Sequence, residues 1–200
     1  PDPPTSVPSK TITTTSLYLH VKIFVAFESQ TQDHLCCYYS SRTPGSAVDW
    51  GISHESEARA EYEALMQVQV AESGLTLDPA FPCIGASPDG IVDDYTILEI
   101  KCPYTGRDKS VKELVNSGYP HVEMDENNQM KLKRTSEYYS QVQGEMALTH
   151  RTMTHLVIWT PVDTEIISVP YDSQFWTQEL LPKLKKFFVT YICPKFVREP

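Results

Sequence analysis

In the stretch Tyr95 to Cys102 the charged residues Glu99 and Lys101 alternate with apolar residues. Successive side chains of a β-strand point to opposite faces of a sheet, so Ile97, Glu99 and Lys101 share one face while the other face is apolar. A second strand-like segment precedes this one, and two aspartates separate them. The pattern predicts a β-hairpin over residues 84–102, with a carboxylate and an ammonium group on one face of its second strand.

Helical signals surround this hairpin. Capping serines and apolar residues at helical spacing mark four segments: Ser53 to about Glu72, Ser110 to Gly118, Ser136 to Thr149, and Asp172 onward with a division at Pro182. A second hairpin is predicted over 156–160 and 165–169. A loop is expected from Glu123 to Arg134. Together these signals predict an α/β fold, a mixed central β-sheet flanked by helices.

Two of the helices have a recognisable inward face. In the first helix Glu55 lies on the same face as the apolar stripe, so one carboxylate is expected to point toward the core. That stripe consists of Ala58, Tyr62, Leu65, Met66 and Gln69. In the last helical segment the residues expected in the core are Phe175, Trp176, Leu180, Leu184, Phe187 and Tyr191.

The length of 200 residues, 40% of them hydrophobic, is enough for one sizeable core and predicts one domain. Residues 1–16 are rich in Pro, Ser and Thr and are expected to form a disordered tail. Residues 17–200 then form a single domain that opens with a strand-like segment, 17–27. The best-supported core of this domain is 50–193.

Charge and cysteine usage limit the class of protein. A net charge of -9 argues against a general nucleic-acid binder with a basic surface, although phosphate affinity depends on the local field near a groove. The five cysteines have no C-x-x-C spacing, which indicates neither a disulfide framework nor a zinc site. No apolar stretch is long enough to span a membrane. We expect an intracellular protein that is not secreted, in the nucleus or cytoplasm of a eukaryote or in the cytoplasm of a phage or bacterial system.

The densest chemical feature is Ser87-Pro88-Asp89-Gly90, followed by Glu99-Ile100-Lys101 on the next strand. Hairpin pairing can bring the carboxylates of Asp89 and Glu99 together, and the carbonyl of Ile100 lies beside them. Mg²⁺ prefers such oxygen ligands, with Mn²⁺ as the alternative ion, and Lys101 could orient or deprotonate the attacking water. The alternative interpretation is a simple turn at Asp89 and a surface ion pair between Glu99 and Lys101.

Several motifs, in order, resemble the phage lambda exonuclease family, the YqaJ-type viral recombinase branch of the PD-(D/E)xK nucleases. They are Trp50-Gly51 with Glu55 and Ala58, Ser87-Pro88-Asp89-Gly90, Leu98-Glu99-Ile100-Lys101-Cys102-Pro103 continuing to Thr105 and Arg107-Asp108, and Tyr138-Tyr139-Ser140-Gln141-Val142-Gln143. The resemblance extends over roughly 50–193 and implies a restriction-endonuclease-like core.

The resemblance also implies roles for individual residues. Asp89, Glu99 and the Ile100 carbonyl would be metal ligands, Glu55 would complete the acidic cluster, Lys101 would serve the water nucleophile, and Gln141 would face the site. A glutamate favoured by the helix dipole is the alternative for Glu55.

Basic residues outside this set are candidates for DNA contact. Arg107 and Lys109 follow the core strand, and a second group consists of Lys131, Lys133 and Arg134. A solvated loop is the alternative for the second group. Arg42 is the arginine available before the Trp-Gly motif, where the family carries a residue that captures the 5′-phosphate.

The resemblance implies a Mg²⁺-dependent 5′-to-3′ exonuclease that hydrolyses linear double-stranded DNA in recombination or DNA processing. It further implies a homotrimer and a single-strand annealing protein as partner. Two alternatives stay open. One is a catalytically inactive, nuclease-derived module that binds DNA or protein, and the other is a structure-specific endonuclease of the same superfamily.

Overall fold

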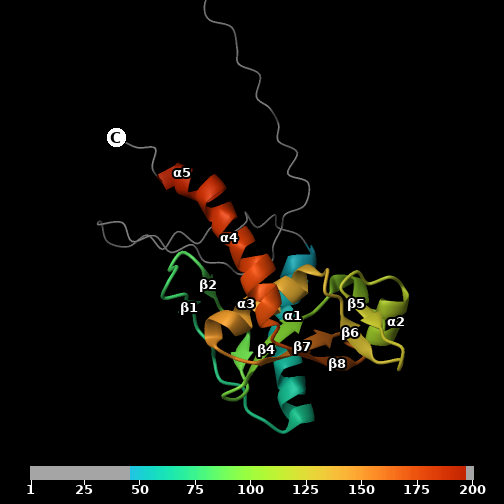
Figure 1. The fold of residues 1–200 in the computed structure, drawn as a ribbon. Helices are drawn as coiled ribbons and strands as arrows, with labels where there is room; N and C mark the ends of the chain where they lie inside the picture. The colour runs from blue at the N-terminus through green and yellow to red at the C-terminus, as the bar shows by residue number, and fades with distance from the viewer. Residues whose placement is uncertain (1–45, 197–200) are drawn as a thin grey trace, which may run out of the picture.

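The computed structural model describes residues 46–196 of the chain (Figure 1). The predicted tail at 1–16, the predicted strand at 17–27 and the candidate Arg42 lie outside the described residues. Within the described part, runs of strands are separated by helices, and the chain continues from α1 to α5.

A four-stranded sheet forms the centre of the described fold. In spatial order its strands are β3 (Gly90–Ile91), β4 (Thr96–Lys101), β7 (Met153–Trp159) and β8 (Thr164–Pro170). The central pair β4 and β7 is parallel, whereas both outer pairs are antiparallel hairpins. The predicted α/β class, the mixed sheet and both predicted hairpins are therefore confirmed.

The first strand of the predicted 84–102 hairpin is shorter than expected. β2 (Gly85–Ala86) pairs with β1 (Thr76–Leu77) in a separate small sheet, and pairing with β4 begins only at β3. Pro88 lies between the two pieces and has no N–H to donate to a ladder. Gly90 is required at the start of β3, because a side chain there would overlap Val70.

Helices cover both faces of the sheet. α3 (Glu137–Thr149) packs on the face that carries Ile97, while Ala58 of α1 (Ser46–Met66) packs on the face that carries Leu98. Alternate residues of β4 therefore enter different core clusters, and both Ile97 and Leu98 are fully buried. Since Glu99 follows the period of Ile97, its carboxylate lies on the α3 side of the sheet.

The first helix differs from the prediction at both ends. α1 begins at Ser46, and Ser53 lies inside it, where its hydroxyl donates to the Trp50 carbonyl rather than capping a terminus. The helix ends at Met66, because Gln67 adopts a left-handed conformation with φ 56°. Leu65, expected in the core, is 57% exposed, and Met66 is also exposed. The inward stripe is correct only through Tyr62, since the last turn extends past the sheet (Figure 1).

The segment predicted as a loop from Glu123 to Arg134 contains a hairpin of β5 (Val122–Met124) and β6 (Met130–Leu132). Asp125 builds its turn, because one carboxylate oxygen accepts from the backbone N–H groups of Asn127 and Gln129. The loop prediction is wrong here because strands this short give little periodic signal. Before this hairpin, η1 (Tyr104–Gly106) leads to α2 (Val111–Asn116), whose predicted capping box is confirmed.

A long helical segment ends the described chain (Figure 1). It consists of η2 (Phe175–Leu180), α4 (Leu181–Phe187), η3 (Phe188–Ile192) and α5 (Cys193–Phe196). The wider π-type turns of η2 change to the α-helix α4 next to Pro182, where the sequence predicted a division of the segment. Phe187 and Tyr191 are exposed, so their predicted place in the core is wrong. The described helices include none that is long and apolar enough to cross a membrane.

Candidate active site

Five polar side chains gather around β4 and α3. Asp89, Glu99, Gln141 and Glu145 are all buried, and only 17% of the Lys101 side chain is exposed. Burying an ionic group costs several kcal/mol unless partners compensate, so such a concentration inside a sheet protein usually marks a functional site. The structure brings together the four predicted residues of this set, and their catalytic roles stay predictions.

Three of these side chains form a closed triangle of hydrogen bonds. Lys101 Nζ donates to Glu99 Oε1 at 2.8 Å and to Gln141 Oε1 at 2.9 Å. Gln141 Nε2 donates to the same Glu99 oxygen at 2.5 Å. The sheet fixes the positions of Glu99 and Lys101, and α3 fixes that of Gln141, so the triangle spans two rigid elements.

Lys101 is held as a cation. Burial is the largest single effect and opposes its charge, but the attraction of Glu99 together with the effects of Tyr138 and Asp89 outweighs burial and raises the pKa of Lys101 above its usual value. The ring of Tyr138 lies 4.7 Å from Nζ and adds a cation–π contact. A lysine in this state donates hydrogen bonds, and both roles expected for Lys101 toward a water stay predictions.

Asp89 is anchored next to Glu99 by backbone contacts. Its Oδ2 accepts from the N–H of Ile100 at 2.8 Å, which places the carboxylate beside β4. Arg59 of α1 donates to the Asp89 carbonyl, a contact for which the sequence gives no signal. Two acidic side chains thus flank the Ile100 backbone.

Glu145 belongs to the same cluster and was not predicted as a site residue. Its Oε1 accepts from Gln141 Nε2 at 2.9 Å, and the residue is fully buried. Burial first, and then the negative charge of Glu99, raises the pKa of Glu145 well above its usual range. Its place one helical turn after Gln141 is the signal that could have identified it.

Glu55 lies half-buried on α1, on the opposite side of the sheet from α3. Burial, followed by the charges of Glu55 and Asp89, raises the pKa of the Cys102 thiol to about 12. Cys102 is therefore a protonated core residue and not a nucleophile. The role of Glu55 as a further metal ligand stays a prediction.

The donor atoms of the cluster suit a hard divalent cation. Asp89 and Glu99 offer carboxylates on neighbouring strands, and the Ile100 backbone lies between them. Within residues 46–196 no group of three or more His, Cys, Asp or Glu side chains is arranged to hold a metal ion. The geometry fits a site with two carboxylate ligands, and metal binding at this site stays a prediction.

The candidate DNA contacts lie in three separate places. Directly after β4, Arg107 packs over the ring of Tyr104 at 4.3 Å and pairs with Asp108, and Lys109 donates to Ser117 Oγ at 3.3 Å. These two basic side chains follow the strand end that carries Lys101. Arg107 is the candidate nearest to the cluster along the chain.

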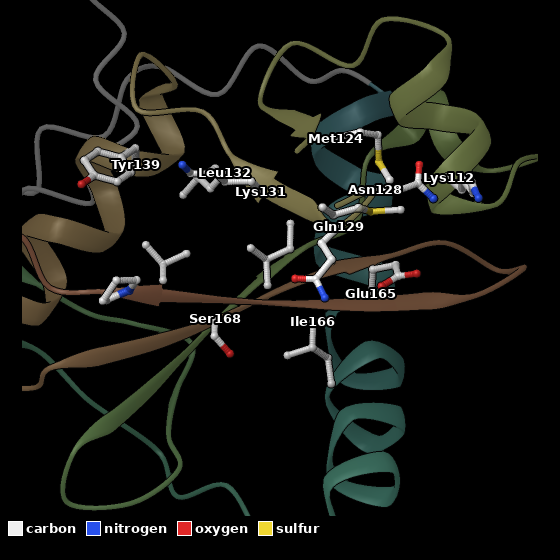
Figure 2. A pocket seen from close by; sticks show the side chains of 14 residues that line it. Lys112, Met124, Asn128, Gln129, Lys131, Leu132, Tyr139, Glu165, Ile166 and Ser168 are labelled. Carbon is white, nitrogen blue, oxygen red and sulfur yellow. The ribbon is translucent and has the colours of Figure 1, made fainter. Parts of the chain in front are cut away.

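A groove of about 700 Å³ between β6 and β8 is the second place (Figure 2). Lys131 and Lys112 lie along it, together with Gln129 and Glu165. Of the described residues that line this groove, none belongs to the buried cluster. Lys133 lies one residue beyond β6, with its backbone N–H bound to His121.

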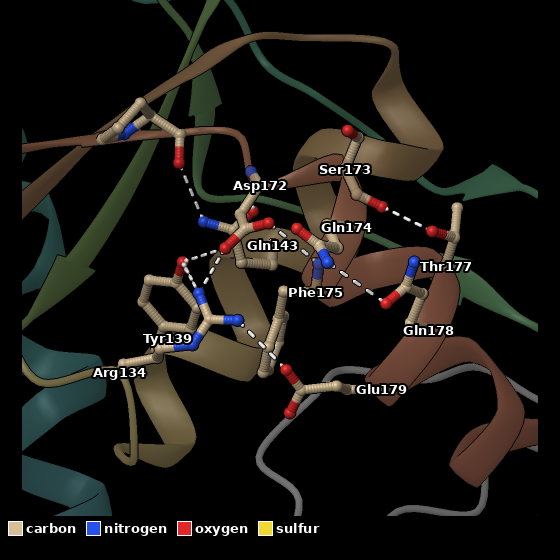
Figure 3. A network of polar contacts seen from close by, with 11 residues as sticks. Arg134, Tyr139, Gln143, Asp172, Ser173, Gln174, Phe175, Thr177, Gln178 and Glu179 are labelled. Carbon is tan, nitrogen blue, oxygen red and sulfur yellow. Dashed lines mark hydrogen bonds and ion pairs between the residues drawn. The ribbon is translucent and has the colours of Figure 1, made fainter.

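The third location of candidate DNA contacts is a polar network around Arg134, beside η2 (Figure 3). Its guanidinium donates to Asp172, to Glu179 at 3.0 Å and to the hydroxyl of Tyr139 at 3.3 Å. This arrangement ties α3 to the final helical segment. A contact of Arg134 with DNA would have to compete with these partners.

A family model for the YqaJ-like viral recombinase domain matches residues 10–152. The match extends over more than half of the chain, and the chain therefore belongs to this family. The resemblance of its motifs to that family is confirmed. No curated protein sequence matches the chain.

Solved structures show the same fold. An alkaline exonuclease from Laribacter hongkongensis is similar at 27% identity and a TM-score of 0.58, over 72% of this chain and 68% of that one. The same exonuclease in complex with dAMP is similar at 25% identity and a TM-score of 0.53, over 76% of both chains. A phage-related exonuclease from Haemophilus somnus, at 13% identity and a TM-score of 0.50 over 74% of this chain and 70% of that one, supports the fold alone. The predicted nuclease-type core is thus confirmed.

Proposed function

We propose that this protein is a divalent-metal-dependent DNA exonuclease that hydrolyses phosphodiester bonds of linear duplex DNA from the 5′ end. The observation that carries the proposal is the triangle of Glu99, Lys101 and Gln141 beside Asp89, in a chain of the YqaJ-like family. The similarity to an exonuclease whose structure contains dAMP supports DNA as the substrate.

Each residue of the cluster would have a distinct task. Asp89 and Glu99, with the Ile100 carbonyl, would hold Mg²⁺ or Mn²⁺, and the bound ion supplies positive charge where the phosphate becomes more negative. Lys101 would donate a hydrogen bond to the attacking water or to a phosphate oxygen. Gln141 would fix the Lys101 ammonium group and the Glu99 carboxylate relative to each other.

In this hydrolysis the water oxygen forms a bond to phosphorus while the bond to the leaving sugar oxygen breaks. A donor placed before the reaction stabilises the developing charge without having to reorganise, which is why a lysine locked by two acceptors is suited to the task. Arg107 and Lys109 would contact phosphates next to the cleaved bond, whereas Lys131, Lys133 and Arg134 would contact DNA farther away. The homotrimer and the annealing partner implied by the resemblance remain predictions.

The test is digestion of 5′-phosphorylated linear duplex DNA with Mg²⁺, using the wild type and Glu99→Ala. We expect mononucleotide release by the wild type, none after chelation of the metal, and none by Glu99→Ala. Equal activity of the two proteins would contradict the catalytic assignment. Cutting of covalently closed circles would indicate an endonuclease, and DNA binding without digestion would indicate an inactive module.

A further inference from the structure

Glu145 is fully buried inside the cluster, yet the proposed hydrolysis assigns it no task. Its contact in the cluster is with Gln141, whose Nε2 donates to Glu145 Oε1 at 2.9 Å. The second carboxyl oxygen, Oε2, has no hydrogen-bond partner among the described residues. A buried carboxyl group with one unsatisfied oxygen lowers the stability of the fold. We therefore look for the role of Glu145 in the hydrogen bond that its other oxygen, Oε1, accepts from Gln141.

The Gln141 carboxamide has two orientations related by a half-turn, and they are not equivalent here. In the observed one, Oε1 accepts from Lys101, and the two N–H groups of Nε2 point at oxygens of Glu99 and Glu145. The opposite orientation would direct the carbonyl oxygen at two carboxyl oxygens and the amide hydrogens at an ammonium group. Glu145 supplies the acceptor for the second N–H, which would otherwise be buried without a partner.

We propose that Glu145 is a positioning residue for catalysis: it fixes the Gln141 carboxamide in the orientation that holds Lys101 and Glu99 in place. The contact needs an acceptor oxygen and no negative charge. This agrees with the raised pKa of Glu145, which burial and the charge of Glu99 cause. The kinetic consequence rests on the proposed nuclease function, whereas the orientation of Gln141 does not.

Two substitutions separate the acceptor from the charge. Glu145→Gln removes the charge and keeps an oxygen that can accept from Gln141, while Glu145→Met removes both at similar length. We expect kcat on linear duplex DNA to fall about 10- to 100-fold in Glu145→Met with KM within about twofold, the usual range for outer residues that orient a site. In Glu145→Gln we expect kcat within about threefold of the wild type, because orientation is kept.

Gln143→Met is the matched control. Gln143 is equally buried on the same helix, but it contacts Pro170 and Asp172 and not the cluster. Its kcat should stay within about twofold of the wild type below its unfolding transition. A folded Glu145→Met protein with wild-type kcat would overturn the proposal. So would a folded Glu145→Gln protein as slow as Glu145→Met.

A second measurement does not depend on activity, and its wild-type and Glu145→Gln arms do not depend on the folding of Glu145→Met. The side-chain amide protons of Gln141, assigned by their loss in Gln141→Met, report its orientation by NMR. We expect slow solvent exchange of both protons in the wild type and in Glu145→Gln, and exchange at least about tenfold faster for one of them in Glu145→Met. Fast exchange in the wild type would overturn the proposal. If the wild type digests no DNA but the exchange rates follow this pattern, the nuclease function fails, while the role of Glu145 in orienting Gln141 stands.

Discussion

Two buried glutamines, two residues apart on α3, are the centres of two different polar networks. Gln141 faces β4 and contacts Glu99, Lys101 and Glu145, all of them ionisable. Gln143 faces the end of β8, donating to the Pro170 carbonyl at 2.9 Å and accepting from the Asp172 N–H at 2.6 Å (Figure 3).

The two networks differ in how completely their polar groups are satisfied. Gln143 uses its carboxamide to satisfy backbone groups, and the adjacent charges of Arg134, Asp172 and Glu179 pair at the surface. In the Gln141 network burial, and then the negative charge of Glu99, raises the pKa of Glu145, and one Glu145 oxygen has no hydrogen-bond partner among the described residues. The first arrangement satisfies backbone groups of the fold, whereas the second is a buried arrangement with a perturbed pKa, of the kind that clusters at functional sites.

The largest effect is expected from Glu99→Gln, which keeps the shape of the side chain and removes its charge. The rate of DNA digestion should fall on the order of 10³-fold, because the variant loses a proposed metal ligand and the anion that holds Lys101. Digestion of end-labelled linear DNA measures this rate, and thermal unfolding serves as the control for folding. A folded variant with a rate within tenfold of the wild type would show that this network is not catalytic.

A moderate effect is expected on the other side of α3. Gln143→Met should lower the free energy of unfolding by about 1–3 kcal/mol, because the Asp172 N–H and the Pro170 carbonyl lose their side-chain partner. Urea denaturation measures this change. No loss of stability would mean that the Gln143 network does not hold the C-terminal segment, and the contrast between the two glutamines would disappear.

The smallest effect concerns pH. The N–H of Phe175 first, and then Arg134, lowers the pKa of Asp172 below its usual value, so the ionised form stabilises the fold. This stability is fully present above the ordinary aspartate pKa of about 3.9 and is lost as the pH falls through the lowered value. In urea denaturation the advantage of the wild type over Asp172→Asn should be constant near neutral pH and shrink below about pH 4. An advantage that grows on acidification would contradict the role of the carboxylate.

Much of the fold was predictable because apolar residues recur at helix or strand spacing in the segments that are buried. The hairpin that ends in β4, the capping box at Ser110 and the start of α3 at Ser136 all match the expectation. The ends of α1 were not predictable, since Ser53 looks like a cap in sequence but donates back to Trp50. The β5–β6 hairpin was missed because its turn depends on Asp125, and such a contact leaves no period in the sequence.

The candidate site was predictable where chemistry follows strand spacing. Glu99 and Lys101 had to share a face of β4, and Gln141 was placed by the resemblance. Glu145 was missed because a buried acid in the middle of a helix looks like an ordinary helical glutamate until its burial is known. For Arg134 the sequence suggested a free basic loop, whereas the structure gives it two acidic partners from distant segments.

The contrast between the two glutamines is tested most directly by single-turnover digestion of 5′-phosphorylated linear duplex DNA with Gln141→Met and Gln143→Met, at a temperature where both are folded. We predict that Gln141→Met digests DNA about 10- to 100-fold more slowly than the wild type, because Lys101 and Glu99 lose the carboxamide that bonds to both of them. Gln143→Met should stay within about twofold of the wild-type rate. Equal rates for the two variants would contradict the assignment of catalysis to the Gln141 network.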